Sequence, residues 1–482
     1  MSEHSLVWFR QDLRIQDNPA LAAAASAGLP VIALFIFAPE EEAPWSPGGA
    51  SKWWLHHALS SLADELAVFG VPLVIRRGKS QDVLRALADE YHVSSVFWNR
   101  RYEPAIVERD TAIKQRLKQQ GVHVQSFNGS LLFEPEQIRN QSGKPFRVFT
   151  PFWKHLRSLP VEMPVHVAED LLIPPVSAAE SESLESLGLL PSIHWDKDFY
   201  HHWDPSRKGA ETALQTFIFD RVGSYKTGRD LPGVEGTSKL SPYLHWGQLG
   251  PREVWQAVQQ TGAADGAGGY TFLSEIAWRE FAYHLLYHFP DTPEQPLNQA
   301  YSHFPWQPDG VYLEAWQSGL TGYPIVDAGM RQLWKTGWMH NRVRMIAASF
   351  LVKHLLQPWQ AGAAWFWDTL VDADLASNTM GWQWTAGCGA DAAPYFRIFN
   401  PILQGEKFDP DGVYVSTWVP ELKKLPARYI HQPWEAPAAV LQQAGIRLGK
   451  DYPKPVIAHQ AGRERALAAL SANKQINLAE QA

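Results

Sequence analysis

Glu275, Trp278 and Arg279 are spaced at i, i+3 and i+4 in a segment with helical hydrophobic spacing. Residues at these separations share one face of an α-helix. The face would present a carboxylate, a large flat ring and a cation together, a combination that can stack on a planar polar ligand and hydrogen-bond to it. An exposed ion pair beside a core tryptophan explains the same three residues equally well.

A second candidate face lies within residues 337–345. Asn341 and Met345 are four residues apart and would share a helical face, whereas Arg342 and Arg344 would point elsewhere. An amide beside a thioether suits a planar polar ligand with an apolar flank. A capping asparagine and a core methionine are the structural alternative.

Acidic and amide side chains gather at Asp372, Asp374 and Asn378. Paired carboxylates can bind a metal ion, but the ligand spacing of a calcium loop is absent and no His or Cys set supports zinc. We therefore predict no metal site here and expect these groups to hydrogen-bond to a polar ring.

The run Gly236-Thr237-Ser238 precedes Pro242 and a helical pattern. Its hydroxyls and backbone N–H groups suit a pyrophosphate. Ser and Thr ahead of a helix are more often simple caps, so the run is a weak signal by itself.

Two patterns of secondary structure must position these residues. In the first part of the chain, strands expected at 4–9, 31–37, 73–76, 93–98 and 122–127 alternate with helices, the first of them over 17–28 with Asp17 as its cap. This alternation predicts a doubly wound parallel sheet. Because no G-x-G-x-x-G follows the first strand, dinucleotide dehydrogenase chemistry is disfavoured.

Later in the chain the strand signals fade and helical spacing dominates. We expect an α/β N-terminal doubly wound parallel-sheet domain over residues 1–130 and a connection over 131–205. A mostly α-helical C-terminal domain would then cover residues 206–482.

Composition narrows the function classes. A net charge of −7 over 482 residues argues against extensive electrostatic binding of nucleic acid, so any phosphate contact must be a local basic patch. Cys388 is the only cysteine, which excludes an intramolecular disulfide. With no secretion signal or membrane span in the pattern, we expect a cytoplasmic protein.

These four stretches, together with the run Trp-Phe-Arg-Gln-Asp-Leu-Arg at 8–14, resemble the photolyase and cryptochrome family over nearly the whole chain. Within it the chain looks most like bacterial class I photolyases, which repair cyclobutane pyrimidine dimers in DNA. The resemblance implies a carbon–carbon lyase in which light-excited reduced FAD lends an electron to the dimer. Ultraviolet-damaged DNA would be its partner, and we expect a monomer with no obligate protein partner.

The resemblance also assigns residues. Contacts to FAD would come from Tyr225, Thr237, Ser238, Lys239, Leu240, Ser241, Phe272, Arg344, Asp372, Asp374 and Asn378. The lesion pocket would be formed by Glu275, Trp278, Asn341, Met345 and Trp384. Arg229, Arg342, Arg397 and Gln404 would lie at the DNA surface. Glu275, Trp278 and Asn341 would contact DNA through the lesion itself.

Trp306, Trp359 and Trp382 match the chain of tryptophans that reduces photoexcited oxidised FAD in this family. Core packing is the alternative, since the sequence contains 22 tryptophans.

Other members of the family set the alternatives. Enzymes for (6-4) photoproducts carry His where this chain has Asn341 and Met345, and a cryptochrome photoreceptor would share the flavin site. A dark flavin oxidoreductase is disfavoured, because no nicotinamide-binding fingerprint occurs.

A second, light-harvesting chromophore would bind the N-terminal domain. Relatives that bind methenyltetrahydrofolate use an Asn-Glu pair and a Lys where Ala105, Ile106 and Pro293 stand here. Residues 98–104 look more like relatives that bind 8-hydroxy-5-deazaflavin, which is therefore the favoured antenna.

Overall fold

The computed structural model describes residues 3–167 and 181–480. The chain divides into two compact units, each built from separate stretches. The first unit comprises Met1–Gly223, Ser238–Pro290 and Val371–Leu375, and the second unit comprises Ser224–Thr237, Asp291–Leu370 and Ala376–Ala482. The domain boundaries expected at residues 130 and 205 stay a prediction.

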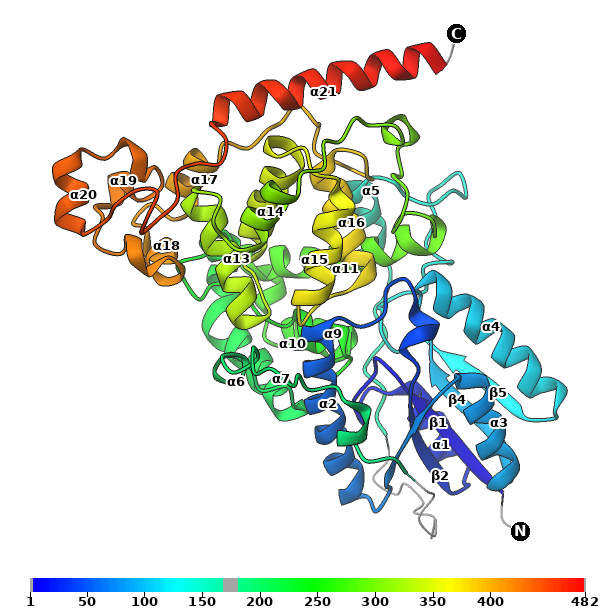
Figure 1. Cartoon of the computed structure of the whole chain (residues 1–482). Helices are drawn as coiled ribbons and strands as arrows, with labels where there is room; N and C mark the ends of the chain where they lie inside the picture. Colours follow the sequence, from blue (N-terminus) through cyan, green and yellow to red (C-terminus); the bar gives the residue numbers. More distant parts are fainter. Residues whose placement is uncertain (1–2, 168–180, 481–482) are drawn as a thin grey trace. The chain divides into compact units, whose positions relative to one another are not determined.

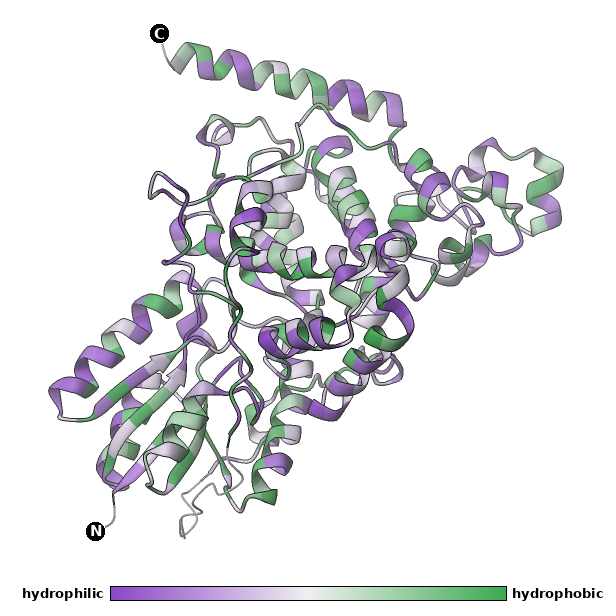
Figure 2. Cartoon of the chain, turned by 180° about the vertical axis from the view of Figure 1, so that it is seen from behind, coloured by the Kyte–Doolittle hydropathy of each residue, from purple (hydrophilic) through white to green (hydrophobic). Residues whose placement is uncertain are grey.

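A five-stranded parallel sheet forms the centre of the N-terminal part of the first unit (Figure 1). Its strands are β1 (His4–Phe9), β2 (Val31–Phe37), β3 (Leu73–Arg77), β4 (Val93–Asn99) and β5 (His123–Phe127), in the order β3-β2-β1-β4-β5. Residues of β2 are buried along the whole strand, and the strands are coloured largely towards the hydrophobic end of the scale in Figure 2. Continuous apolar strands are typical of a parallel sheet covered on both faces. The predicted doubly wound α/β fold is thus confirmed.

Helices connect the strands in sequence. They are α1 (Pro19–Ser26), α2 (Gly49–Val68), α3 (Ser80–Glu90) and α4 (Pro104–Gln119). From β1 the chain extends the sheet on one side through β2 and β3, and then on the other side of β1 with β4 and β5. The carboxyl ends of β1 and β4 therefore flank the switch point at which α/β proteins bind ligands.

The predicted cap of α1 was wrong by one residue. Asn18, not Asp17, is the N-cap, and its side chain accepts a hydrogen bond from the Leu21 N–H at 3.1 Å. Because Pro19 occupies the first helical position, the residue just before it is the one placed to cap. Asp17 instead adopts a φ of 51° and accepts the Val165 N–H at 2.9 Å.

Arg14 is buried in the first unit and joins segments far apart in the chain. Its guanidinium donates to the carbonyl oxygens of Asp17 at 2.5 Å, Gly129 at 2.6 Å and Gly247 at 2.8 Å. These bonds satisfy most of the donors of a cation that burial would otherwise destabilise.

The rest of the first unit is helical. Its larger helices are α5 (Phe149–Leu156), α7 (Arg207–Thr216), α10 (Pro251–Gln260) and α11 (Ala267–His288), with the short α9 (Ser241–His245) before α10. Helix α11 packs against α5.

The second unit is built from helices, as predicted for the C-terminal part. They include α12 (Gly310–Gln317), α13 (Pro324–Thr336), α14 (Asn341–Ser349), α15 (Trp359–Thr369), α16 (Leu375–Ala386), α17 (Pro401–Phe408) and the long α21 (His459–Glu480) (Figure 1). Helix α14 runs on into a π-helical turn at Phe350–His354. Within the described ranges, no helix has both the length and the apolar character needed to cross a membrane.

Candidate functional site

The predicted acidic group is buried in the first unit. The Ser241 hydroxyl donates to Asp372 Oδ2 at 2.6 Å, which brings two predicted residues together. Asp374 instead meets two residues that the sequence did not single out. The Tyr283 hydroxyl donates to Asp374 Oδ2, and His245 Nδ1 lies 3.4 Å from the same oxygen.

No group of His, Cys, Asp or Glu side chains capable of holding a metal ion occurs among the residues that the structure describes.

Trp278 and Glu275 lie on α11 and are partly exposed. The indole of Trp278 stacks on the ring of Phe149 from α5, with centroids 3.7 Å apart and planes 9° apart. Phe149 thus supports one side of the indole, a contact that no local pattern in the sequence indicated. Phe272, earlier on α11, is buried, and its ring centroid lies 4.3 Å from that of Phe217.

Arg279, on the same helix, also contacts other parts of the first unit. Its Nη1 donates to the Ser130 carbonyl oxygen at 2.7 Å, and its guanidinium lies 4.9 Å from the ring centre of Tyr283.

Helix α14 of the second unit carries the second predicted face. Asn341 is exposed and Met345 is partly buried. Arg342 forms an ion pair with Asp230 at 2.6 Å, and its Nη1 lies 3.8 Å from Met345 Sδ. His340 caps the helix by accepting the Arg342 N–H at 3.2 Å, so Asn341 is not the cap.

Arg344, on the same helix, donates through Nε to the Met339 carbonyl oxygen at 2.7 Å. The loop 225–237 lies in the same unit, and there the Arg229 guanidinium stands 5.6 Å from the ring centre of Tyr225. A Cβ at Gly236 would lie 2.8 Å from the Gly228 Cα, so this loop closes tightly only with glycine. Thr237 ends this stretch.

Ser238, Lys239 and Leu240 continue the run in the first unit. Lys239 has a φ of 53°, and the Leu240 N–H donates to the Ser238 hydroxyl oxygen at 3.4 Å. A left-handed residue inside a run of hydroxyls is a turn that directs successive N–H groups towards one side, as anion-binding loops do.

Trp382 is buried in the second unit among aromatic rings that the sequence did not indicate. Its centroid lies 5.0 Å from Phe366 and 6.1 Å from Trp316. Trp359 is buried at the start of α15. The ring centroid of Trp306 lies 4.4 Å from that of Phe304. Among the residues described, the rings of these three predicted tryptophans do not contact one another.

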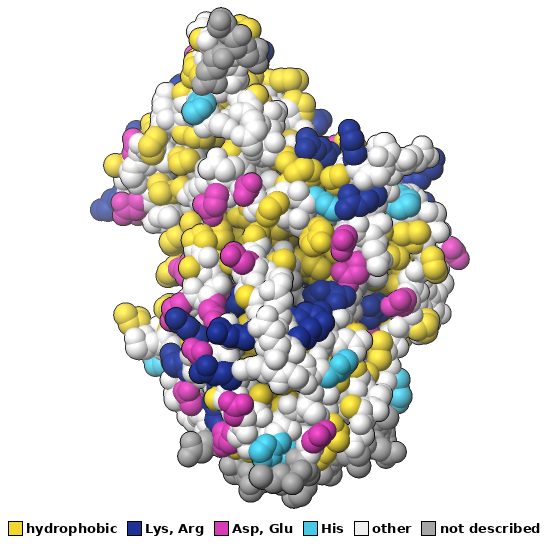
Figure 3. Space-filling model, turned by 90° about the vertical axis from the view of Figure 1, so that its right-hand side faces the viewer, with side chains coloured by type: hydrophobic (Ala, Val, Ile, Leu, Met, Phe, Trp, Pro, Cys, Tyr) yellow, Lys and Arg dark blue, Asp and Glu magenta, His cyan; other side chains and the backbone are white. Residues whose placement is uncertain are grey.

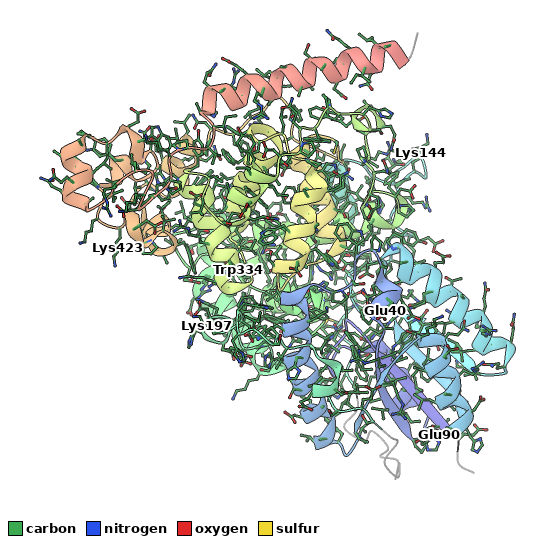
Figure 4. All side chains as sticks on the ribbon, in the orientation of Figure 1. Glu40, Glu90, Lys144, Lys197, Trp334 and Lys423 are labelled. Atoms are coloured by element: carbon green, nitrogen blue, oxygen red, sulfur yellow. The ribbon has the colours of Figure 1, made fainter. Side chains whose placement is uncertain are left out.

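Trp384 and Asn378 lie on α16 and are partly exposed. Asn378 donates through Nδ2 to the Ala363 carbonyl oxygen at 3.1 Å. Figure 4 shows side chains of all types between the helices of this unit.

Arg397 is exposed, and Gln404 is partly exposed on α17. The buried Lys353 donates through Nζ to the Arg397 carbonyl oxygen at 2.9 Å. Burial, and then the charge of Arg397, lower the pKa of Lys353 to about 8. On the face that Figure 3 shows, Lys and Arg side chains are interspersed with acidic ones and form no uniform basic surface.

A cavity of the first unit opens at the carboxyl ends of β1 and β2. Its lining includes Trp8, Arg10, Phe37, Leu55, Arg101 and Arg109. The guanidinium groups of Arg10 and Arg109 lie 4.7 Å and 4.8 Å from the ring centre of Trp8. A flat ring with two cations beside it suits a planar, anionic ligand.

The chain thus combines a doubly wound parallel sheet that has a cavity at its strand ends with a second, helical unit. Residues 5–168 match the family model described as DNA photolyase, and residues 272–472 match the FAD binding domain of DNA photolyase.

Known proteins match this chain over nearly its whole length. Deoxyribodipyrimidine photo-lyase of Agrobacterium fabrum is 50% identical, with 98% of each chain covered. Cryptochrome-1 of Arabidopsis thaliana is 41% identical over 99% of this chain and 72% of its own. The crystal structure of a bacterial class III photolyase from Agrobacterium tumefaciens has a TM-score of 0.95 at 49% identity, with 98% of each chain covered.

This chain belongs to the photolyase and cryptochrome family and carries its FAD-binding domain. The similarity does not single out class I, because the solved relative is described as a class III photolyase.

Proposed function

We propose that this protein is a deoxyribodipyrimidine photo-lyase, a light-driven enzyme that splits cyclobutane pyrimidine dimers in DNA. The observation that carries the proposal is the Phe149-backed Trp278 with Glu275 one turn earlier on α11. The relative at 50% identity over 98% of each chain bears that enzyme's name. The solved relative described as class III favours that class over class I.

The residues present fit FAD. Hydroxyl groups and N–H groups of Thr237, Ser238, Lys239, Leu240 and Ser241 suit the two phosphates, and the buried Asp372 and Asp374 suit donors of the flavin ring. Tyr225, Phe272, Arg344 and Asn378 are the remaining contacts that we propose. When bound, FAD supplies the photoexcited electron that opens the cyclobutane ring and is then returned.

The chain's own residues bind and orient the lesion. A dimer must leave the duplex stack to reach the site, and its disrupted pairing lowers that cost. Trp278 and Trp384 would stack on the two fused bases. Glu275 and Asn341 would hydrogen-bond to them, and Met345 would contact their face.

Arg229, Arg342, Arg397 and Gln404 would hold the DNA backbone. Such contacts fix the position of the duplex without reading its sequence.

Illumination of the purified protein with oligonucleotides carrying one defined lesion each tests the proposal. We expect cyclobutane dimers to be split and (6-4) photoproducts to remain, because Asn341 and Met345 stand where (6-4) enzymes carry His. Repair of (6-4) photoproducts alone would show that the protein is a (6-4) photolyase instead. If neither lesion is repaired, a cryptochrome-type photoreceptor is favoured.

We propose further that an antenna chromophore binds the cavity lined by Trp8, Arg10 and Arg109. Its two cations suit the anionic ring of 8-hydroxy-5-deazaflavin, and Ala105, Ile106 and Pro293 replace the residues expected for methenyltetrahydrofolate. Acid extraction of protein from its native host, followed by mass spectrometry, distinguishes the two; a folate would overturn the assignment. A monomeric, cytoplasmic enzyme stays a prediction from the sequence.

A further inference from the structure

Asp374 belongs to a buried hydrogen-bonded group that lies wholly in the first unit. Its Oδ2 accepts the Tyr283 hydroxyl of α11, and His245 Nδ1 of α9 lies 3.4 Å from the same oxygen. His245 donates to Asp374 in the tautomer protonated at Nδ1. Two helices thus fix one oxygen of a carboxylate on the short segment Val371–Leu375.

The surroundings keep Asp374 ionised. Burial alone would raise the pKa of Asp374, but the hydrogen bond from His245, the charge of Arg279 and the Tyr283 hydroxyl together hold this pKa well below its usual range. Burial and the charge of Asp374 raise the pKa of Tyr283 well above its usual value. Tyr283 therefore remains a donor over the whole working pH range.

Two cations balance the negative charge around this group. The Arg279 guanidinium lies 4.9 Å from the Tyr283 ring centre, and Arg101 pairs with the buried Glu103 at 2.8 Å. Burial and the nearby charge of Asp374 raise the pKa of Glu103, but the charge and hydrogen bond of Arg101 lower it overall. Arg101, Glu103, His245, Arg279 and Tyr283 line one small polar cavity at the strand ends.

We propose that Tyr283 and His245 are positioning residues that hold the Asp374 carboxylate ionised and oriented, and thereby set the reduction potential of the bound FAD. This inference rests on the proposed function, because it takes Asp374 as a neighbour of the flavin ring. A fixed negative charge in a dry site disfavours the reduced flavin when that form is an anion. Weakening the charge should make FAD easier to reduce.

A double-mutant cycle on the full chain, loaded with FAD, tests this step. The midpoint potential of bound FAD is measured for Tyr283→Phe, Asp374→Asn and the double variant. We expect Asp374→Asn to shift the potential to more positive values, because the negative charge is lost. Tyr283→Phe should shift it the other way, because the carboxylate stays ionised but loses a donor that screens its charge. The double variant should match Asp374→Asn, because Tyr283 acts through Asp374. Additive shifts, or no shift in Tyr283→Phe, would overturn the proposal.

His245 provides a second, independent variant in case Tyr283→Phe does not fold. His245→Asn can place a donor near the Nδ1 position and should keep the native potential, whereas His245→Leu should shift it as Tyr283→Phe does. Equal potentials for these two variants contradict the proposal. Tyr287→Phe, the same change one turn further along α11, is the control and should leave the potential unchanged.

Dimer repair by the unaltered protein separates this inference from the proposed function. If the unaltered protein binds and reduces FAD but splits no dimer, the proposed function fails while the cycle still reports on Tyr283. If Asp374→Asn leaves the potential unchanged, Asp374 is not a neighbour of the ring and the inference itself fails.

Discussion

The indole of Trp382 packs directly on Gly362 of the adjacent helix α15. A Cβ at position 362 would overlap the six-membered ring, with Trp382 Cζ2 only 2.6 Å away. Glycine at this position is therefore what allows Trp382 to sit beside Phe366 and Trp316.

Gly362→Ala should destabilise the second unit, because Trp382 must move. Overpacking of this kind costs about 1–3 kcal/mol. The free energy of unfolding in urea measures the effect. Gly381→Ala on α16 is the matched control, since a Cβ there meets open space and the change should be neutral or slightly stabilising.

Trp382→Phe should keep the fold and the bound FAD but abolish or strongly slow photoreduction of oxidised FAD. Indole can be oxidised in place, whereas a phenyl ring is a far poorer donor. Time-resolved absorption of the flavin after a light flash measures the rate. Trp334→Phe should photoreduce normally, because Trp334, labelled in Figure 4, is 53% exposed on α13 and stacks on Trp365 rather than on Trp382. If Trp382→Phe photoreduces at the normal rate, Trp382 has only a packing role.

Glu275→Ala should lower dimer repair by roughly 10- to 100-fold, the loss expected for one hydrogen bond involving a charged group. The FAD content should be unchanged, because we place this carboxylate at the lesion. Flavin absorbance of the purified variant and the single-turnover repair rate measure the two effects separately. A variant purified without FAD would show that Glu275 has a structural role.

Asp110→Asn should destabilise the first unit by about 3–5 kcal/mol at pH 7, because it leaves the buried Arg10 guanidinium without its ion-pair partner. Asp451→Asn, which removes a solvent-exposed pair with Arg447, should cost far less. Thermal unfolding of both variants provides the comparison.

The Arg10–Asp110 ion pair also predicts that the free energy of unfolding depends on pH. Burial would raise the pKa of Asp110, but the charges of Arg10 and Arg109 lower it overall. Because the pKa of Asp110 is lower in the folded protein than in the unfolded chain, the ionised carboxylate stabilises the fold. This stabilisation is present above the unfolded pKa, near 3.8, and is lost as the pH falls through the folded pKa. The acid-induced loss of stability should therefore be smaller in Asp110→Asn; an identical acid profile would contradict the assignment.

Arg397→Ala should weaken DNA binding equally for all sequences around the dimer and reduce the salt slope by about one. Arg342→Ala should change the slope less, because Asp230 already neutralises part of the Arg342 charge. Fluorescence anisotropy at several salt concentrations, with varied flanking bases, measures both. An effect confined to certain flanks would contradict backbone positioning.

The parallel sheet was predictable because its central strands, β1 and β2, are short apolar runs, and such runs need no distant information to be recognised. Helices α10 and α13 begin at Pro251 and Pro324, because proline favours the first helical turn. The cap of α1 was missed because Asp17 and Asn18 are both good caps, and the choice depends on where Pro19 places the first turn.

The site was only partly predictable. The resemblance identified Trp278, Asp374 and Trp382, but their partners could not be found from spacing. Phe149, Tyr283 and Trp316 lie on other elements, and only tertiary packing brings them into contact. Helical periodicity reports which residues share a face and carries no information on what that face meets.

The bonds of Arg14 and the position of Asp372 also determine when the first unit can be completed during synthesis on the ribosome. The five strands have all been made once Phe127 emerges, yet one acceptor of the buried Arg14 is the carbonyl of Gly247. The segment Val371–Leu375, whose Asp372 accepts the Ser241 hydroxyl, is made later still. Residues 291–370 of the second unit therefore leave the ribosome before the first unit is whole, so the N-terminal unit cannot finish folding before much of its C-terminal neighbour exists.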